Sequence, residues 1–122
     1  WIVDDVFKYL RYLRDKRKKF DLIVLDPPKF APTSKHISKA TRGYKDINLL
    51  GFKLLRAGGM LSTFSCSGGI SQELFQKVVS DAALDANVRA RIINRFHQAP
   101  DHPVLLSFPE GEYLKGLLLQ VE

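Results

Sequence analysis

The sequence is poor in cysteine and has no long apolar runs. A single cysteine among 122 residues excludes an internal disulfide bond and is typical of a reducing compartment, so we expect a cytoplasmic protein. No apolar run approaches the roughly 20 residues that a membrane-spanning helix needs, and the first residues are unlike a signal peptide. The chain has no internal repeat, low-complexity tract or linker, so we expect no domain boundary within it.

Positive charge is in excess. Lysine and arginine number 19 against 13 acidic residues, and this net charge of +6 favours a polyanionic partner, although lysine also improves solubility. The cations of residues 8–19 accompany an apolar helical stripe, and we interpret them as the solvated face and last turn of a helix. A basic loop predicted over residues 31–42 is better placed for phosphate contacts. Its His36 has no second histidine or cysteine nearby, so we predict no metal site.

Residues 20–30 contain the most informative stretch of the chain. An aliphatic run, Leu22 to Leu25, is typical of a strand buried on both faces, and it ends at Asp26 followed by two prolines. Proline cannot continue a strand's hydrogen-bond ladder, so the chain turns outward here. Ligands of open α/β sheets bind beyond the carboxyl ends of the strands. Asp26 is therefore a candidate site residue, although a carboxylate in this place can also simply hydrogen-bond its own turn.

The rest of the chain alternates between predicted strands and helices. The alternation predicts a parallel sheet with helices on both faces. The predicted strands are residues 1–3, 22–25, 60–64 and 89–96, and periodicity alone predicts a hairpin over residues 104–121. The predicted helices begin at Asp4 or Asp5, at Tyr44 (ending at Arg56, before Gly58-Gly59) and after Ser71.

The lone cysteine lies in a turn of small residues after the strand predicted at residues 60–64. A right-handed crossover through one helix makes this strand a neighbour or near neighbour of the one that ends at Asp26. Cys66 and Asp26 are then expected to face one cleft. A single cysteine is usually a small buried core residue, but a position beyond a strand end, among serine and glycine, favours a reactive thiol.

Several segments of the chain form a recognisable combination. They are residues 20–30, 42–48 (Arg-Gly-Tyr-Lys-Asp-Ile-Asn), 64–68 (Phe-Ser-Cys-Ser-Gly), 101–103 (Asp-His-Pro), 110–111 (Glu-Gly) and 113–116 (Tyr-Leu-Lys-Gly). Together they resemble the bacterial 23S rRNA 5-methylcytosine methyltransferases of the ribosomal RNA large subunit methyltransferase I type, and the resemblance covers essentially the whole chain. Asp-Pro-Pro alone occurs in many methyltransferases, whereas its combination with the other segments is specific.

The resemblance implies an α/β fold, the class I or Rossmann-like fold of S-adenosylmethionine-dependent methyltransferases. Its sheet is mostly parallel, with an antiparallel last strand. In the family order the chain begins at the third strand, Asp26 ends the fourth, Cys66 follows the fifth, and residues 113–121 form the seventh. Residues 104–108 then belong to a connection, which we adopt over the hairpin. We therefore expect residues 1–122 to be part of a catalytic domain, without its first two strands, its glycine-rich cofactor turn or the N-terminal PUA domain.

The resemblance also implies residue roles. Cys66 corresponds to the nucleophile that attacks carbon 6 of cytosine, and Asp26 is placed to stabilise the adduct. Asp5 corresponds to the residue that contacts the adenine amine of S-adenosylmethionine, while a plain helix N-cap remains open for it. Asp26 and Pro27 would line the cofactor and base pocket, and the phosphates of 23S rRNA would contact Lys29, Arg42 and Lys45. The base that removes the carbon 5 proton stays unassigned.

One departure from related enzymes leaves alternatives open. Other RNA 5-methylcytosine enzymes carry a second cysteine where this chain has Asp26-Pro27-Pro28-Lys29, so either product release differs or the thiol role of Cys66 is wrong. An exocyclic-amine methyltransferase would use the Asp-Pro-Pro motif without a thiol, and an RNA-binding or assembly fragment would have no activity. Without the missing strands, residues 22–25 would form an open apolar edge. We expect the isolated chain to dimerise through it, exchange elements or aggregate, and to bind S-adenosylmethionine poorly.

Overall fold

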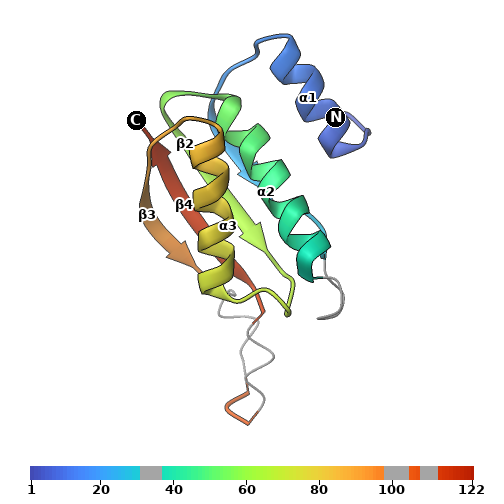
Figure 1. The fold of residues 1–122 in the computed structure, drawn as a ribbon, viewed down its shortest axis with the longest axis vertical. Coiled ribbons are helices and arrows are strands. Elements are labelled where there is room, and N and C mark those ends of the chain that lie inside the picture. Colours follow the sequence, from blue (N-terminus) through green and yellow to red (C-terminus); the bar gives the residue numbers. More distant parts are fainter. Residues whose placement is uncertain (31–36, 98–104, 108–112) are drawn as a thin grey trace.

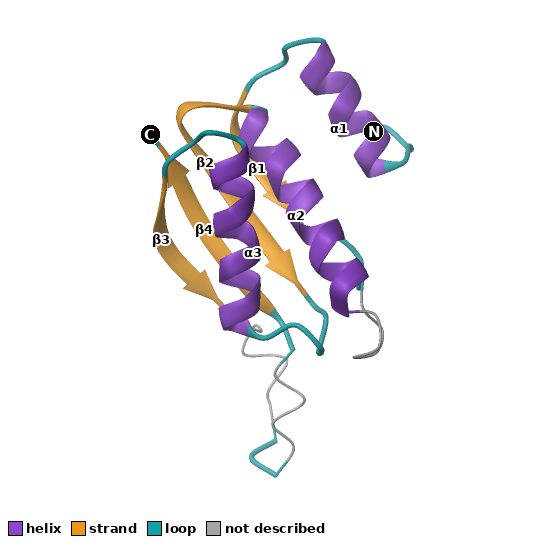
Figure 2. Ribbon diagram, in the orientation of Figure 1, coloured by secondary structure: helices purple, strands orange, loops and turns teal. Residues whose placement is uncertain are grey.

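The chain folds into a four-stranded sheet with helices packed against it (Figures 1 and 2). The structure is a computed structural model and describes residues 1–30, 37–97, 105–107 and 113–122. In order the elements are α1 (Val6–Asp15), β1 (Phe20–Leu25), α2 (Ile37–Lys53), β2 (Leu55–Ser65), α3 (Gln72–Asp85), β3 (Ala90–Phe96) and β4 (Lys115–Val121).

The sheet combines parallel and antiparallel pairs in the order β1-β2-β4-β3. Strands β1 and β2 are parallel, and β4 runs antiparallel to both of its neighbours, β2 and β3. Strands β1, β2 and β3 therefore point the same way, and the predicted mostly parallel sheet with an antiparallel last strand is confirmed. The hairpin that periodicity alone predicts is wrong, because β4 inserts between β2 and β3.

Helices α2 and α3 lie side by side over one face of the sheet, as both ribbon views show (Figures 1 and 2). The prediction of helices on both faces is wrong for the described residues. On the opposite face Leu22 and Val24 of β1 are 58% and 60% exposed, so this strand is not buried on both faces either. The core lies between the helices and the sheet, and its most buried side chains include Tyr44, Ile47, Leu50, Phe52, Leu54, Leu61, Ile70 and Phe75.

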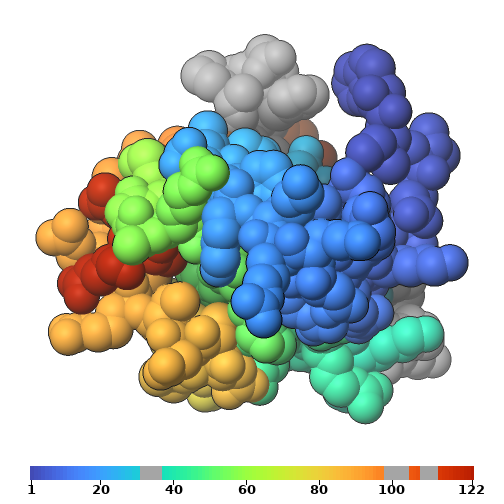
Figure 3. Space-filling view, turned by 90° about the horizontal axis from the view of Figure 1, so that it is seen from above, coloured from blue at the N-terminus to red at the C-terminus, as the bar shows by residue number. Residues whose placement is uncertain are grey.

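The strand predicted at residues 1–3 does not form. Trp1 and Val3 are fully exposed, and the first residues project from the body of the molecule (dark blue in Figure 3). A strand needs a hydrogen-bonded neighbour, and the sheet offers none beside these residues. The helix that follows is as predicted, with Asp5 as its N-cap.

The second helix is shifted relative to its prediction. Helix α2 begins at Ile37, inside the predicted loop, and ends at Lys53, before Gly58-Gly59. These glycines lie within β2, where Gly58 has a φ of +81° and the register with β1 is irregular. A Cβ atom on Gly59 would lie 2.9 Å from the Arg56 carbonyl oxygen. Gly58 and Gly59 therefore allow an irregular start of β2 and do not end a helix. Helix α3, capped by Ser71, and strand β3 match their predictions.

Candidate active site

The two predicted site residues at strand ends emerge at the same edge of the sheet. Asp26 follows β1 and Cys66 follows β2, and these strands are parallel neighbours with Leu25 opposite Thr63. Asp26 is exposed, Pro27 beside it is buried, and Cys66 is a partly buried free thiol. The predicted adjacency of the two strand ends is confirmed.

The turn after β1 is shaped by local sequence and anchored by one aromatic ring. Its two prolines have fixed φ angles, and Phe30 just beyond them packs edge-on against Tyr44 at 4.7 Å between ring centroids. Phe30 also lies 6.0 Å from Phe7 of α1. A Cβ atom on Gly43 would come within 3.3 Å of the Phe30 ring, so the glycine allows this close approach.

The turn after β2 is held by buried hydrogen bonds centred on Ser67, which is fully buried. The Ser67 hydroxyl lies 2.7 Å from the Tyr44 hydroxyl, and its carbonyl oxygen accepts from Lys115 Nζ, also at 2.7 Å. Its backbone N–H donates to Ser65 Oγ at 3.3 Å. Cys66 is therefore flanked by two buried serines, whose positions are set by α2 and β4 as well as by the turn itself.

Tyr44 connects the two turns. Its ring contacts Phe30 on the β1 side and Phe75 of α3 at 5.8 Å, while its hydroxyl contacts Ser67 on the β2 side. The side chain is fully buried, so these contacts are shielded from water. Any change in the position of Tyr44 would be felt at both strand ends.

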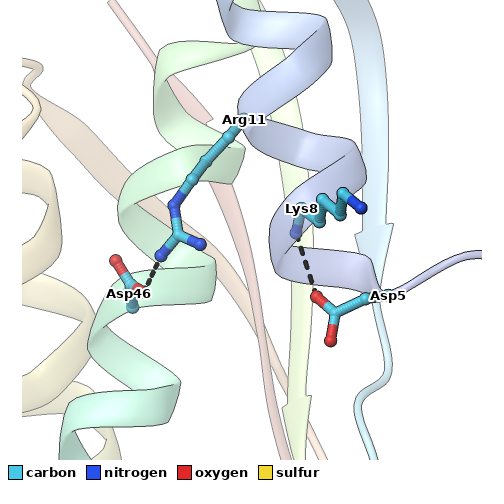
Figure 4. Close-up of polar contacts among 4 residues, drawn as sticks. All are labelled: Asp5, Lys8, Arg11 and Asp46. Atoms are coloured by element: carbon cyan, nitrogen blue, oxygen red, sulfur yellow. Dashed lines mark hydrogen bonds and ion pairs between the residues drawn. The ribbon is translucent and has the colours of Figure 1, made fainter.

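An open hollow lies between helices α1 and α2. It has a volume of about 630 Å³, and its lining includes Asp5, Arg42 and Lys45. Asp5 Oδ1 accepts from the Lys8 backbone N–H at 3.0 Å, so the N-cap that the sequence left open does form, and an Arg11–Asp46 ion pair of 2.8 Å joins the two helices (Figure 4).

The predicted phosphate-binding residues lie in two places. Arg42 and Lys45 line the hollow between α1 and α2, whereas the exposed Lys29 follows the β1 turn. Lys45 forms an ion pair of 2.8 Å with Asp85 of α3, and the hydrogen bond and charge of Asp85 raise the pKa of Lys45. The positive charge of Lys29 acts on Lys115 and lowers the pKa of that lysine.

No protein-family model matches the chain. Over 117 residues it is 59% identical to ribosomal RNA large subunit methyltransferase I of Shewanella frigidimarina, covering 96% of this chain and 30% of that protein. Over 121 residues it is 54% identical to the protein of the same name from Citrobacter koseri, covering 99% of this chain and 31% of the relative.

The chain is a relative of ribosomal RNA large subunit methyltransferase I. It spans about 30% of the length of the curated relatives it matches.

Solved structures agree on the fold. SMU.776 complexed with SAH matches 98% of this chain with a TM-score of 0.78 at 22% identity, covering 30% of that chain. A methyltransferase homolog protein from Pyrococcus horikoshii matches 89% of this chain with a TM-score of 0.60 at 19% identity, covering 41% of that chain. The predicted class I methyltransferase fold is thereby confirmed for this relative of ribosomal RNA large subunit methyltransferase I.

Three buried polar residues of the site are not predicted from the sequence. Tyr44, Ser67 and Lys115 lie in the segments that resemble the methyltransferases, but the sequence alone indicates no role for them. A signal was present for Lys115, because it shares the inward face of β4 with Leu117, Leu119 and Val121. A lysine in register with an apolar face is unusual enough to be noted.

Metal sites and membrane-spanning helices can be assessed for the described residues. The described residues contain no group of His, Cys, Asp and Glu side chains that could hold a metal ion. Among them no helix is long and apolar enough to cross a membrane. His36 lies outside the described residues.

Proposed function

We propose that this chain forms part of the catalytic domain of an S-adenosylmethionine-dependent RNA methyltransferase that makes 5-methylcytosine in 23S rRNA, with Cys66 as nucleophile. The names of the relatives support the rRNA substrate. The observation that carries the proposal is that Cys66 and Asp26 leave adjacent parallel strands at one edge of the sheet, where Tyr44 contacts Phe30 in the turn after β1 and Ser67 in the turn after β2.

The chemistry requires a nucleophile, because carbon 5 of cytosine is too poor a nucleophile to accept a methyl group unaided. The Cys66 sulfur adds to carbon 6, a C–S bond forms, and the electron pair of the carbon 5–carbon 6 double bond makes carbon 5 nucleophilic. Asp26 hydrogen-bonds the ring nitrogen or exocyclic amine of the flipped base while this charge develops. After methylation a base removes the carbon 5 proton, the double bond re-forms and the C–S bond breaks.

Asp5, Asp26 and Pro27 suit the adenine side of S-adenosylmethionine and the adjoining wall of the base pocket. S-adenosylmethionine supplies the methyl group when bound. Asp5 is exposed, and its hydrogen bond to the Lys8 amide involves one carboxylate oxygen, which leaves the other to accept from an adenine amine. Asp26 is also exposed, and the buried Pro27 forms a rigid wall beside it. Two solved structures of similar fold are complexes with SAH and with SAM.

The cationic residues are proposed to hold the RNA backbone. Lys29, next to the β1 turn, contacts a phosphate near the flipped base. Arg42 and Lys45 contact phosphates further along the strand, at the hollow between α1 and α2. Each contact is independent of base identity and weakens with salt.

Trapping with 5-fluorocytosine tests the covalent step. The longer protein that includes these residues is incubated with S-adenosylmethionine and rRNA fragments that carry either cytosine or 5-fluorocytosine. Fluorine at carbon 5 cannot leave as a proton does, so we expect a stable protein–RNA adduct with 5-fluorocytosine alone. The Cys66→Ala variant should form none and should lose methyl transfer, on the order of 10³-fold or more.

The same experiment separates the alternatives. The exposed Asp26 beside Pro27 also suits an exocyclic-amine methyltransferase, which needs no thiol. In that case methylation would occur without an adduct, and the Cys66→Ala variant would stay active. A protein that binds the RNA but neither methylates nor cross-links would instead be an RNA-binding or assembly module.

A further inference from the structure

Lys115 at the start of β4 is a buried lysine on an otherwise apolar strand face. It is 6% exposed and pairs in register with Ser65, immediately before Cys66. The other inward side chains of β4 are Leu117, Leu119 and Val121. Burying an ammonium among such neighbours is costly, and an apolar side chain of similar length would pack there at lower cost.

The hydrogen-bond partner of the Lys115 ammonium among the described residues is a backbone oxygen and not a carboxylate. Among the described residues no carboxylate forms an ion pair with it, and its hydrogen bond goes to the Ser67 carbonyl oxygen. Burial lowers the pKa of Lys115, the charge of Cys66 acts in the opposite direction, and Lys29 lowers it further. Within the described part of the chain, the charge of the Cys66 sulfur acts favourably on this ammonium.

We propose that Lys115 is a positioning residue for Cys66, whose ammonium fixes the Ser65–Ser67 turn and stabilises the sulfur when it is a thiolate. Its use in methyl transfer rests on the proposed function, whereas the effect on the thiol does not. A neutral donor would be enough to hydrogen-bond the Ser67 carbonyl oxygen. The hydrogen bond alone therefore does not explain why the side chain carries a positive charge.

Alkylation of Cys66 tests this inference without requiring catalysis. Because the chain has a single cysteine, mass spectrometry of the 122-residue chain after iodoacetamide treatment reports on Cys66 alone. Lys115→Met removes both the charge and the donor, while Lys115→Gln removes the charge and keeps a donor for Ser67. The thiolate is the reactive species, so we expect both variants to react about tenfold more slowly than the unmodified chain near neutral pH.

A matched control uses a lysine on the surface. Lys77 of α3 is 72% exposed and forms an ion pair with Asp81, so Lys77→Met should leave the alkylation rate unchanged. Urea unfolding of each variant shows whether a rate change has a structural origin, because a loosened turn would expose Cys66 and speed its reaction.

Each outcome decides the inference. Slower alkylation in both Lys115 variants, with unfolding midpoints no lower than that of the unmodified chain, supports it. Rates equal to or above that of the unmodified chain would overturn it, as would failure of both variants to fold, since Lys115 would then be needed for folding. Slower alkylation together with no 5-fluorocytosine adduct in the longer protein would refute the proposed function and leave the role of Lys115 intact.

Discussion

Strands β1 and β2 are parallel neighbours that each end in a proposed catalytic residue, yet they are stabilised differently. In β2 the inward residues Leu61, Thr63 and Ser65 are fully buried, and the turn beyond is held by hydrogen bonds from α2 and β4. Strand β1 is an edge, and the turn beyond it depends on two prolines and the packing of Phe30. The tertiary structure therefore preorganises Cys66, whereas Asp26 is positioned mainly by its own local sequence.

The largest effect on turnover in this comparison is expected from a substitution at Asp26, beyond β1. Asp26→Asn in the longer protein keeps the shape of the side chain and removes its charge, so we expect turnover to fall on the order of 10²-fold. The melting temperature should barely change, because Asp26 is exposed. Asp21→Asn on the same strand, where the carboxylate is 82% exposed, is the control for both measurements. Equal losses of turnover and stability in Asp26→Asn would mean that the carboxylate mainly forms the turn.

On the β2 side we expect stability and turnover to fall together. Tyr44→Phe leaves the buried Ser67 hydroxyl without its tyrosine partner, which should lower the free energy of unfolding by about 1–2 kcal/mol. Turnover should fall about tenfold, because the turn that carries Cys66 loses a contact. Chemical denaturation and methyl-transfer assays measure the two effects. Tyr12→Phe, at a residue that is 54% exposed on α1, should change neither; an unchanged stability in Tyr44→Phe would contradict this account.

A smaller effect concerns the edges of the sheet. β1 exposes Leu22 and Val24, whereas β3, the other edge, carries Arg91 and Arg95. Charged residues discourage edge-to-edge pairing, so we expect the isolated 122-residue chain to self-associate through β1. Val24→Lys should shift its sedimentation toward the monomer, and Ile93→Lys on β3 should not. A monomeric unmodified chain would refute the prediction.

The smallest expected effect is a change of stability with pH. The pKa of Lys115 lies below its ordinary value of 10.5 in the folded chain, mainly because the side chain is buried. The folded state therefore binds fewer protons than the unfolded state between these two pKa values, and stability rises as the pH increases through this window. The cost of the buried charge is fully present at lower pH. Lys115→Met should remove this rise, so urea unfolding curves of the two proteins should converge or cross with increasing pH; a constant difference would contradict the assignment.

Local patterns were sufficient for some elements and insufficient for others. The cap residues Asp5 and Ser71 lie where their helices begin, because a cap acts on the backbone N–H groups beside it. The apolar pattern predicts that the second helix begins at Tyr44, whereas α2 begins at Ile37. Gly58-Gly59 predicts a helix end but lies within β2. Glycine serves helix ends and strand irregularities equally well, and the pairing of β2 with β1, which decides between them, is a contact between distant segments.

The sequence by itself determined that the chain turns at Asp26-Pro27-Pro28, because proline excludes both a continued strand and a helix whatever surrounds it. It also determined, through its alternation of strands and helices, that Asp26 and Cys66 leave the sheet at the same edge. Only the tertiary structure decided that Tyr44 joins the two turns and that Lys115 donates to the Ser67 carbonyl oxygen beside Cys66. Those contacts link α2, β2 and β4, and their hydrogen bonds exist only after packing has excluded water.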